Sequence, residues 1–309
     1  MKTQSLIIDC DPGVDDAVAL LLAFASPEFD LLAVTTVGGN VAADLTARNA
    51  RIVRQIAGRE DTPVFRGAEK PLRRLPSAAG DFHGEDGLGD LTPFEPEAGL
   101  AFGASAEAIV AHAMARPERS VAVAVLGPLT NLALAMRLEP RLAAHLGPVV
   151  VMGGARSEGG NITASAEFNI WADPDAAAEV LASGCEVVML GLDATHQVRP
   201  DEAVIERMAA LDNPRAALAA RMLRFSNEVE RTVVGGESAP LHDPCIIAWL
   251  LRPELFRLRP CRIEVETESD LTRGHTAVEF RVPDDAAPHR WAVAANAPAI
   301  LDLLTERLA

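Results

Sequence analysis

Residues 6–25 contain, in order, a short apolar run, a Pro-Gly turn and an Ala/Leu-rich stretch. This order predicts a buried strand that turns sharply into a helix. Four carboxylates, those of Asp9, Asp11, Asp15 and Asp16, lie between the end of the strand and the first turn of the helix. In open α/β sheets, ligands bind at the carboxyl ends of the strands. The sequence therefore places four acidic side chains at a ligand-binding edge.

These four carboxylates carry like charges at short separation. Such charges repel one another, so a cation or a strong set of hydrogen-bond donors is needed to hold them together. Asp15 or Asp16 could alternatively cap the helix and interact favourably with its dipole. Because capping explains one or two carboxylates and not four, we predict a metal or catalytic site.

Segments typical of strands and of helices alternate along the first two thirds of the chain. Short apolar runs, typical of strands in a parallel sheet covered on both faces, lie at 31–37, 120–126, 148–152 and 186–192. Ala/Leu-rich helix candidates lie at about 43–57, 104–115, 129–145 and 174–183. This alternation predicts an α/β fold with an open, doubly wound, mostly parallel sheet and helices on both faces.

The last third of the chain follows a different pattern. Helices are predicted at roughly 201–211 and 214–230, and strand-like pieces within 262–293 are expected to add to one edge of the sheet. Because neither a linker nor a repeat is visible, we expect residues 1–309 to form a single domain.

The bulk composition is typical of a soluble cytoplasmic enzyme. The formal net charge of −16 argues against nucleic acid or an anionic membrane as a partner. The sequence has no run of about 18 apolar residues, and its first residues do not resemble a signal peptide. The four cysteines are widely spaced without a CxxC pair, which is typical of reduced thiols. We therefore expect a cytoplasmic location.

Three long polar segments, 70–99, 153–172 and 231–244, interrupt the regular pattern. Loops of this length in a compact domain are usually functional or disordered. Because they follow strands or precede a helix, we expect them to converge on the edge that carries the aspartates.

Several motifs together resemble one family. The run Asp9–Asp16 is similar to the DxDPGxDD signature of the nucleoside hydrolases of the inosine-uridine-preferring type. Further matches, in the family's order, are Thr36–Asn40, Leu126–Asn131, Met152–Gly154, Asn161, Glu167–Asn169 and Leu241–Pro244. The resemblance covers essentially the whole chain. It implies a nucleoside-hydrolase-like fold and hydrolysis of the N-glycosidic bond of ribonucleosides to ribose and free base.

The resemblance also implies a metal centre. Asp11, Asp16 and Asp243 would ligate Ca²⁺, with the backbone carbonyl of Leu126 as a further ligand; hard oxygen donors suit this ion. Asp11 would in addition be the general base for a water bound by the metal. Asp243 could alternatively be the N-cap of the helix that starts with Asp243-Pro244.

Ribose hydroxyl groups need charged or amide partners. The resemblance assigns this role to Asp15, Asn40, Asn161, Glu167 and Asn169, and it places Met152 in the lining of the sugar pocket. Asn40 could equally be a turn residue, and Met152 could be only the end of a buried strand. Asp9 is expected to support the site from behind.

Histidine is the natural proton donor near neutral pH. The resemblance places His242 beside the leaving base, as the acid and as a substrate contact. His83 resembles a second base-side histidine, although a lone histidine in a loop is commonly only solvated. The chain has no tyrosine, which pyrimidine-preferring relatives often bring to the base, and its three tryptophans lie in contexts that favour packing. The preference for purine or pyrimidine therefore stays open.

Two other functions were weighed. A metal-dependent phosphohydrolase could use the Asp-rich loop together with His242 and Asp243. Against it, Pro12 follows the second aspartate, no Gly-rich phosphate loop is present, and the acidic site would repel phosphate. A calcium-dependent ribosyl-binding protein without turnover would need an impaired base, yet Asp11 is intact. The partners expected from the resemblance are a small ribonucleoside and further copies of the chain in a homodimer or homotetramer.

Overall fold

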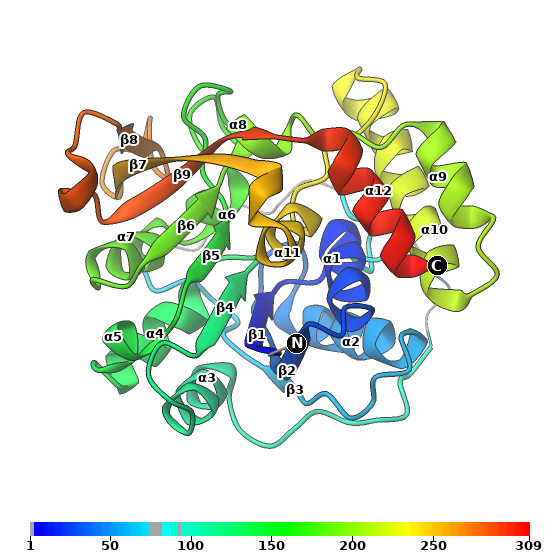
Figure 1. Ribbon diagram of the computed structural model, residues 1–309, viewed down its shortest axis with the longest axis horizontal. Helices are drawn as coiled ribbons and strands as arrows, with labels where there is room; N and C mark the ends of the chain where they lie inside the picture. Colours follow the sequence, from blue (N-terminus) through cyan, green and yellow to red (C-terminus); the bar gives the residue numbers. More distant parts are fainter. Residues whose placement is uncertain (1–2, 74–81, 90, 92–93) are drawn as a thin grey trace.

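The computed structural model describes residues 3–73, 82–89, 91 and 94–309. Its centre is a nine-stranded sheet with helices on both faces (Figure 1). The strands are β1 (Gln4–Cys10), β2 (Phe29–Thr36), β3 (Val64–Arg66), β4 (Val121–Val125), β5 (Val149–Met152), β6 (Val187–Leu190), β7 (Phe256–Val265), β8 (Thr276–Glu279) and β9 (His289–Ala295). The predicted α/β class is confirmed.

The helices connect and flank these strands. They are α1 (Val14–Phe24), α2 (Ala43–Ile56), α3 (Ser105–Met114), α4 (Thr130–Leu138), α5 (Leu142–His145), α6 (Phe168–Ala172), α7 (Pro174–Ala182), α8 (Leu192–Thr195), α9 (Glu202–Ala209), α10 (Pro214–Val229), α11 (Pro244–Leu251) and α12 (Ala297–Leu308). A π-helix, η1 (Glu230–Val234), continues α10, and two 3₁₀ helices are η2 (Pro253–Leu255) and η3 (Asp284–Ala286). None of the described helices is long and apolar enough to cross a membrane.

The strand order is β3-β2-β1-β4-β5-β6-β9-β7-β8. The chain runs from β1 through β2 to β3 at one edge, and then returns to β4 and continues in the other direction. Both β2 and β4 pair with β1 in parallel. The direction of winding therefore changes between β1 and β4, and in this class of sheet the crevice at such a switch point is where ligands bind.

Alternation along β1 divides the core into two layers. Leu6 and Ile8 pack on the side of α1, α2 and the α9–α12 group, whereas Ile7 packs on the side of α3, α4, α5 and α7 (Figure 1). All three side chains are fully buried. A strand covered on both faces must be apolar throughout, which explains why the sequence shows a continuous apolar run before Asp9.

The prediction of one helix at about 129–145 is wrong, because this segment forms two helices, α4 and α5. It breaks after Leu138, and Glu139 has an extended backbone with φ −134° and ψ 93°. The residue after Glu139 is Pro140. Proline disfavours the helical conformation in the residue before it and has no N–H to donate, so the break follows from local chemistry.

The strand-like pieces at 262–293 do add to the sheet, as predicted. These strands begin earlier than predicted, at Phe256. The last of them in sequence, β9, lies next to β6 and pairs with it in parallel. Strand β7 pairs antiparallel with β9 on one side and with β8 on the other. Arg257, Arg259 and Arg262 of β7 are exposed, whereas Cys261 and Ile263 are buried. This edge carries a second polar region, remote in sequence from the aspartates.

Candidate active site

The candidate active site lies at the switch point between β1 and β4. Asp11 is the first residue after β1, and Leu126 is the first residue after β4. The backbone N–H of Leu126 donates to the carbonyl of Asp9 at 2.7 Å, so the two strand ends are in register. A methyl group built on Gly39 or Gly127 would collide with the Asp11 carboxylate. The two loops therefore close on this side chain because both carry glycine there.

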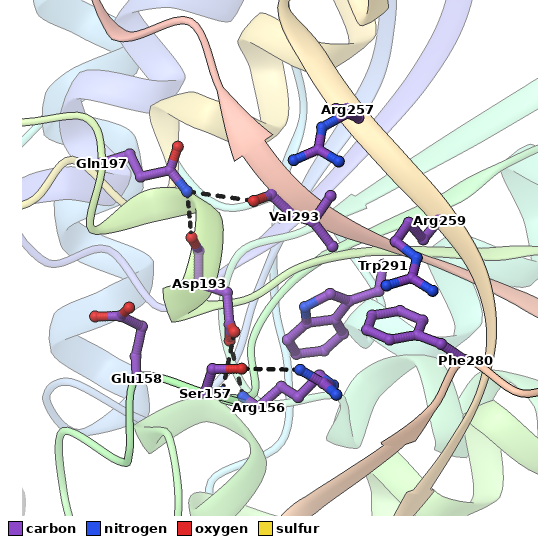
Figure 2. A pocket seen from close by; sticks show the side chains of 10 residues that line it. All are labelled: Arg156, Ser157, Glu158, Asp193, Gln197, Arg257, Arg259, Phe280, Trp291 and Val293. Atoms are coloured by element: carbon purple, nitrogen blue, oxygen red, sulfur yellow. Dashed lines mark hydrogen bonds between the residues drawn. The ribbon is translucent and has the colours of Figure 1, made fainter.

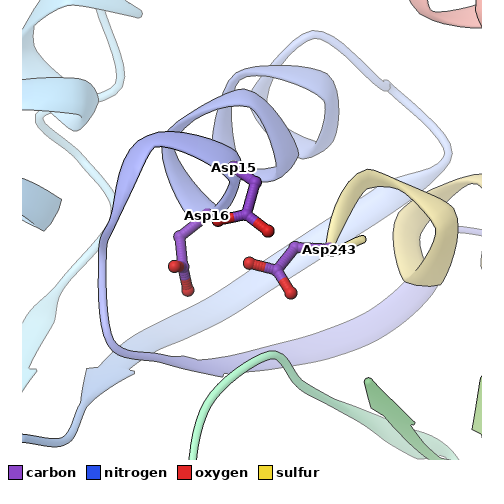
Figure 3. A group of neighbouring side chains, drawn as sticks. All are labelled: Asp15, Asp16 and Asp243. Atoms are coloured by element: carbon purple, nitrogen blue, oxygen red, sulfur yellow. The ribbon is translucent and has the colours of Figure 1, made fainter. Parts of the chain in front are cut away.

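Three carboxylates from two helices meet in front of this edge. Asp15, Asp16 and Asp243 each offer an oxygen, and these oxygens all lie within 4.8 Å of one another (Figure 3). Asp243 occupies the N-cap position of α11, but its side chain forms no capping hydrogen bond. Capping therefore does not account for the Asp243 carboxylate, which points toward the first turn of α1.

Hydrogen bonds fix the orientation of Asp11 and Asp16. The backbone N–H of Asn40 donates to Oδ2 of Asp11 at 2.7 Å, and its Nδ2 donates to Oδ2 of Asp16 at 3.1 Å. Oδ2 of Asp16 also accepts from the N–H of Gly13 at 2.9 Å, so Asp16 caps α1 in addition to facing the cluster. Oδ1 of Asp11 is buried and has no partner among the described residues. Oδ1 of Asp11 is therefore available to bind a metal ion or a water molecule.

The electrostatics of the cluster favour a cation. Burial raises the pKa of Asp16 to about 7, and it raises the pKa of Asp11 and of Asp243 well above the usual range. A bound cation acts in the opposite direction and stabilises the ionised carboxylates. The donors are all oxygen atoms, and one of them is orphaned, which fits a hard cation such as Ca²⁺.

The geometry differs in one detail from the predicted ligand set. The cluster of three contains Asp15, which we predicted as a sugar contact, in place of Asp11. Leu126, the predicted carbonyl ligand, accepts a hydrogen bond from Nδ2 of Asn169 at 2.6 Å. Its carbonyl has a second lone pair. Asp11, Asp16, Asp243 and Leu126 stay our predicted ligands, with Asp15 beside them.

Asp9 lies at the carboxyl end of β1, two residues before Asp11, and its support of the site stays a prediction. Its carboxylate is fully buried and accepts from Thr35 Oγ1 at 2.6 Å and from Asn131 Nδ2 at 2.8 Å. Asn131 also donates to the carbonyl of Thr36 at 2.8 Å, which ties α4 to the end of β2. Sequence reasoning gave no role to Thr35 or Asn131, although Asn131 lies in one of the motifs that carry the resemblance.

Four of the residues predicted to contact ribose lie in the segment that runs from the end of β5 into α6: Met152, Asn161, Glu167 and Asn169. Asn169 donates to the carbonyls of Leu126 at 2.6 Å and of Met152, at the end of β5, at 3.2 Å. The Glu167 carboxylate is buried and accepts backbone N–H groups, including that of Gly154 at 2.9 Å. Asn161 is exposed and accepts from the N–H of Phe168 at 2.9 Å. Glu167 and Asn161 therefore shape the loop before α6, and their contact with ribose stays a prediction.

Two histidines lie near the carboxylate cluster. Nδ1 of His83 accepts from the N–H of Val14 at 3.2 Å and lies 4.0 Å from Oδ1 of Asp15. His83 is therefore at the first turn of α1 and not merely solvated. Nδ1 of His242 lies 2.8 Å from Oγ1 of Thr195. Burial lowers the pKa of His83 and lowers that of His242 to about 4, so both rings are neutral near pH 7.

Thr195 was missed by sequence reasoning. It is fully buried at the end of α8, and His196 next to it places its ring 5.7 Å from that of His242. A threonine 47 residues before a histidine carries no local signal, since only the packing of α8 against the loop before α11 brings them together.

Comparison with known proteins assigns the family. A family model described as inosine-uridine preferring nucleoside hydrolase matches residues 6–303. The pyrimidine-specific ribonucleoside hydrolase RihA of Photobacterium profundum is 41% identical over 99% of this chain and 99% of its own length. The solved structure of a plant nucleoside hydrolase superposes with a TM-score of 0.92 at 31% identity, covering 99% of this chain and 98% of that one. A purine-preferring ribonucleoside hydrolase from Gardnerella vaginalis gives a TM-score of 0.92 at 29% identity, covering 99% and 98%.

The fold and the carboxylate cluster at its switch point are thus those of a hydrolytic enzyme. The chain belongs to the inosine-uridine preferring nucleoside hydrolase family. This confirms the predicted family and enzyme class, and it favours nucleoside hydrolysis over the phosphohydrolase and the non-catalytic binding protein.

Proposed function

We propose that this chain hydrolyses the N-glycosidic bond of ribonucleosides in a calcium-dependent reaction that yields ribose and free base. The observation that carries the proposal is the Asp11 carboxylate. It is buried, held by Asn40 through one oxygen, and unpartnered at the other. Asp16 and Asp243, with the carbonyl of Leu126, complete an oxygen donor set for Ca²⁺ around it. Bound calcium would polarise the attacking water and bind the sugar.

Asp11 is the proposed general base. Its orphaned oxygen is free to take a proton from water as that water attacks C1′ of the ribose. The transition state has oxocarbenium character, so positive charge develops on the sugar ring. The carboxylates grouped around Asp15 and Asp16 stabilise that charge. Asp15 and Asn169 are proposed to hold the ribose hydroxyls.

His242 is the proposed donor to the leaving base. A pKa of about 4 keeps the ring neutral at neutral pH, so it carries one proton on one nitrogen. We assign the Thr195 hydroxyl, 2.8 Å from Nδ1, as the donor of this hydrogen bond, which leaves the proton of the ring on Nε2. Nε2–H can then donate a hydrogen bond to the base and stabilise the negative charge that develops on it as the C–N bond breaks, and the departing base takes up its proton from water. Thr195 is a positioning residue in this scheme.

We further propose that pyrimidine ribonucleosides are preferred. The support is that the pyrimidine-specific relative is 41% identical, whereas the purine-preferring one is 29% identical. A homodimer or homotetramer is proposed from the family resemblance alone.

The test is base release from a panel of nucleosides, with ribose measured as the second product. Uridine and cytidine should be hydrolysed faster than inosine and adenosine, and deoxyuridine should be much poorer than uridine, because a site built to bond a hydroxyl is left unpaired without it. A preparation that releases phosphate from phosphate esters and no base from any nucleoside would refute the proposed activity.

A further inference from the structure

A second polar region lies at the edge of the sheet formed by β7 and β9. It is a cavity of about 340 Å³, and its walls include Arg156, Arg257, Arg259, Phe280 and Trp291 (Figure 2). Asp193, in α8, also lines the cavity. None of these residues belongs to a motif of the family resemblance, and the nucleoside-hydrolysis scheme uses none of them.

An aromatic ring organises two of the three guanidinium groups. Cζ of Arg259 lies 4.0 Å and Cζ of Arg156 lies 4.6 Å from the centroid of the Phe280 ring. Figure 2 shows the ring between the two groups. A guanidinium stacked on an aromatic ring keeps its N–H donors in its own plane, pointing away from the ring. Apart from the bond of Arg156 Nη1 to Ser157 Oγ at 2.9 Å, these donors stay available.

Two carboxylates, Glu158 and Asp193, also line this cavity. In the described part of the chain, neither forms a salt bridge with Arg156, Arg257 or Arg259. The two oxygens of Asp193 accept the backbone N–H groups of Arg156 at 2.8 Å and of Ser157 at 2.9 Å, and Glu158 lies 3.1 Å from Nδ1 of His196. The guanidinium groups are therefore not paired with the carboxylates of the cavity.

The Trp291 indole forms part of the cavity wall. Its side chain is fully buried in β9, and its Nε1 has no hydrogen-bond partner among the described residues. Because solvent does not reach Nε1, the indole contributes packing to the pocket and not a hydrogen bond to a ligand.

We propose that this arginine pocket, defined by Arg156, Arg257, Arg259, Phe280 and Trp291, binds the phosphate group of a small molecule. A carboxylate presents two coplanar oxygens and is satisfied by one guanidinium fork. A tetrahedral phosphate presents more acceptors in different directions, and only such an anion uses guanidinium groups that approach from separate segments. The site is independent of the proposed nucleoside hydrolysis, because it shares no residue with that mechanism.

The experiment measures phosphate binding by calorimetry on the full chain. It is done at about 0.15 M ionic strength, where exposed charges are screened beyond about 8 Å, and at micromolar free calcium so that calcium phosphate stays dissolved. The probes are inorganic phosphate, glycerol 3-phosphate and acetate. The wild type should bind one phosphate per chain in the pocket, and acetate at least about tenfold more weakly, because it engages fewer charge-assisted hydrogen bonds.

Variants locate the site. R257Q/R259Q should weaken the binding of both phosphate probes at least about tenfold, since it removes charge-assisted bonds. R262Q is the matched control: it makes the same type of change three residues further along β7, where strand alternation places the side chain on the other face. It should keep wild-type affinity. Tighter binding of glycerol 3-phosphate than of phosphate would identify a phosphate ester as the ligand, whereas binding of phosphate alone would identify the free ion.

Several outcomes would overturn the proposal. These are no binding of either phosphate probe, equal affinity for acetate and phosphate, or unchanged affinity in R257Q/R259Q. Sedimentation of the same proteins covers one more alternative. If R257Q/R259Q dissociates an oligomer while the wild type binds no phosphate, the arginines contact a second copy of the chain and not a small anion. Because calorimetry reads binding directly, a preparation that hydrolyses no nucleoside still tests the pocket.

Discussion

The carboxylate cluster and the arginine pocket are both concentrations of like charge, but they are built in opposite ways. The cluster uses short side chains that are buried and oriented by backbone N–H groups and by Asn40. The pocket uses long side chains that are exposed and carried by segments far apart in sequence. Burial multiplies the cost of an unbalanced charge, whereas solvent screens exposed charge. The cluster therefore needs its cation for the fold as well as for chemistry, while the pocket needs its anion only for binding.

Replacement of Asp11 should produce the largest effect. Asp11→Ala should lower turnover of uridine by at least about 10²–10⁴-fold, because loss of a general base alone has this effect and loss of a metal ligand adds to it. Turnover is measured on protein whose fold is checked by circular dichroism and whose calcium content is measured. Near wild-type turnover in a folded variant would show that the buried cluster is not the catalytic region.

Removal of calcium should abolish activity and change how stability depends on pH. Burial raises the folded-state pKa of Asp16 from 3.8 to about 7. A raised folded-state pKa means that the fold favours the protonated form, so its contribution is complete below the unfolded pKa and is lost as pH rises through about 7. The melting temperature of calcium-free protein should therefore fall between pH values of about 4 and 7.

Calcium-loaded protein should not show this loss, since its ligands are ionised already, and at saturating calcium its melting temperature should be higher by mass action. Dialysed protein with and without added calcium is compared over the same pH range. Identical melting curves with and without calcium would contradict the proposed metal site, whatever the activity.

How far the sequence predicted the molecule differs between the two regions. Asp9, Asp11, Asp15 and Asp16 lie within eight positions, so strand and turn signals were enough to put them at one edge. The edge itself followed from the alternation of strands and helices. The break at Pro140 and the early start of β7 were not predicted, because element boundaries depend on local backbone chemistry and on strand pairing.

Contacts between distant segments were beyond sequence reasoning. The bond between Thr195 and His242 depends on the packing of α8, and the arginine pocket joins residue 156 to residues 257, 259, 280 and 291. Exposed arginines occur along the whole chain, so no single one is distinctive in the sequence. The predicted loop at 70–99 lies partly outside the described residues, and its described part brings His83 to the first turn of α1.

His242→Ala should have an effect that depends on the leaving group. On uridine, turnover should fall by about 10²-fold or more, which is the usual range for loss of a positioned acid. On a nitrophenyl riboside, whose leaving group departs without an acid, the loss should be far smaller. Calcium content is measured in the same variant, since His242 precedes Asp243. Equal losses on both substrates with calcium retained would remove His242 from the donor role.

Thr195→Val tests the position of that donor. Valine keeps the branched shape but cannot bond Nδ1 of His242, which should lower uridine turnover about fivefold, the equivalent of about 1 kcal/mol for one hydrogen bond. Turnover of the nitrophenyl riboside should change less, and Thr195→Ser should restore uridine turnover because it keeps the hydroxyl. If the Thr195→Ser and Thr195→Val variants have the same turnover on both substrates, Thr195 contributes only packing.

The smallest effect on the folded protein is expected in the arginine pocket. Arg257→Gln should change the free energy of unfolding by less than about 0.5 kcal/mol, because exposed side chains without buried partners contribute little. Asn131→Ala, its counterpart behind the carboxylate cluster, should lower that free energy by about 1–3 kcal/mol, since it removes one of the two donors to the buried Asp9 carboxylate. Urea unfolding of both variants in calcium measures the two values. A loss in Arg257→Gln as large as that in Asn131→Ala would mean that the arginines stabilise the fold, and the contrast between a buried cluster tied to folding and an exposed pocket tied only to binding would fail.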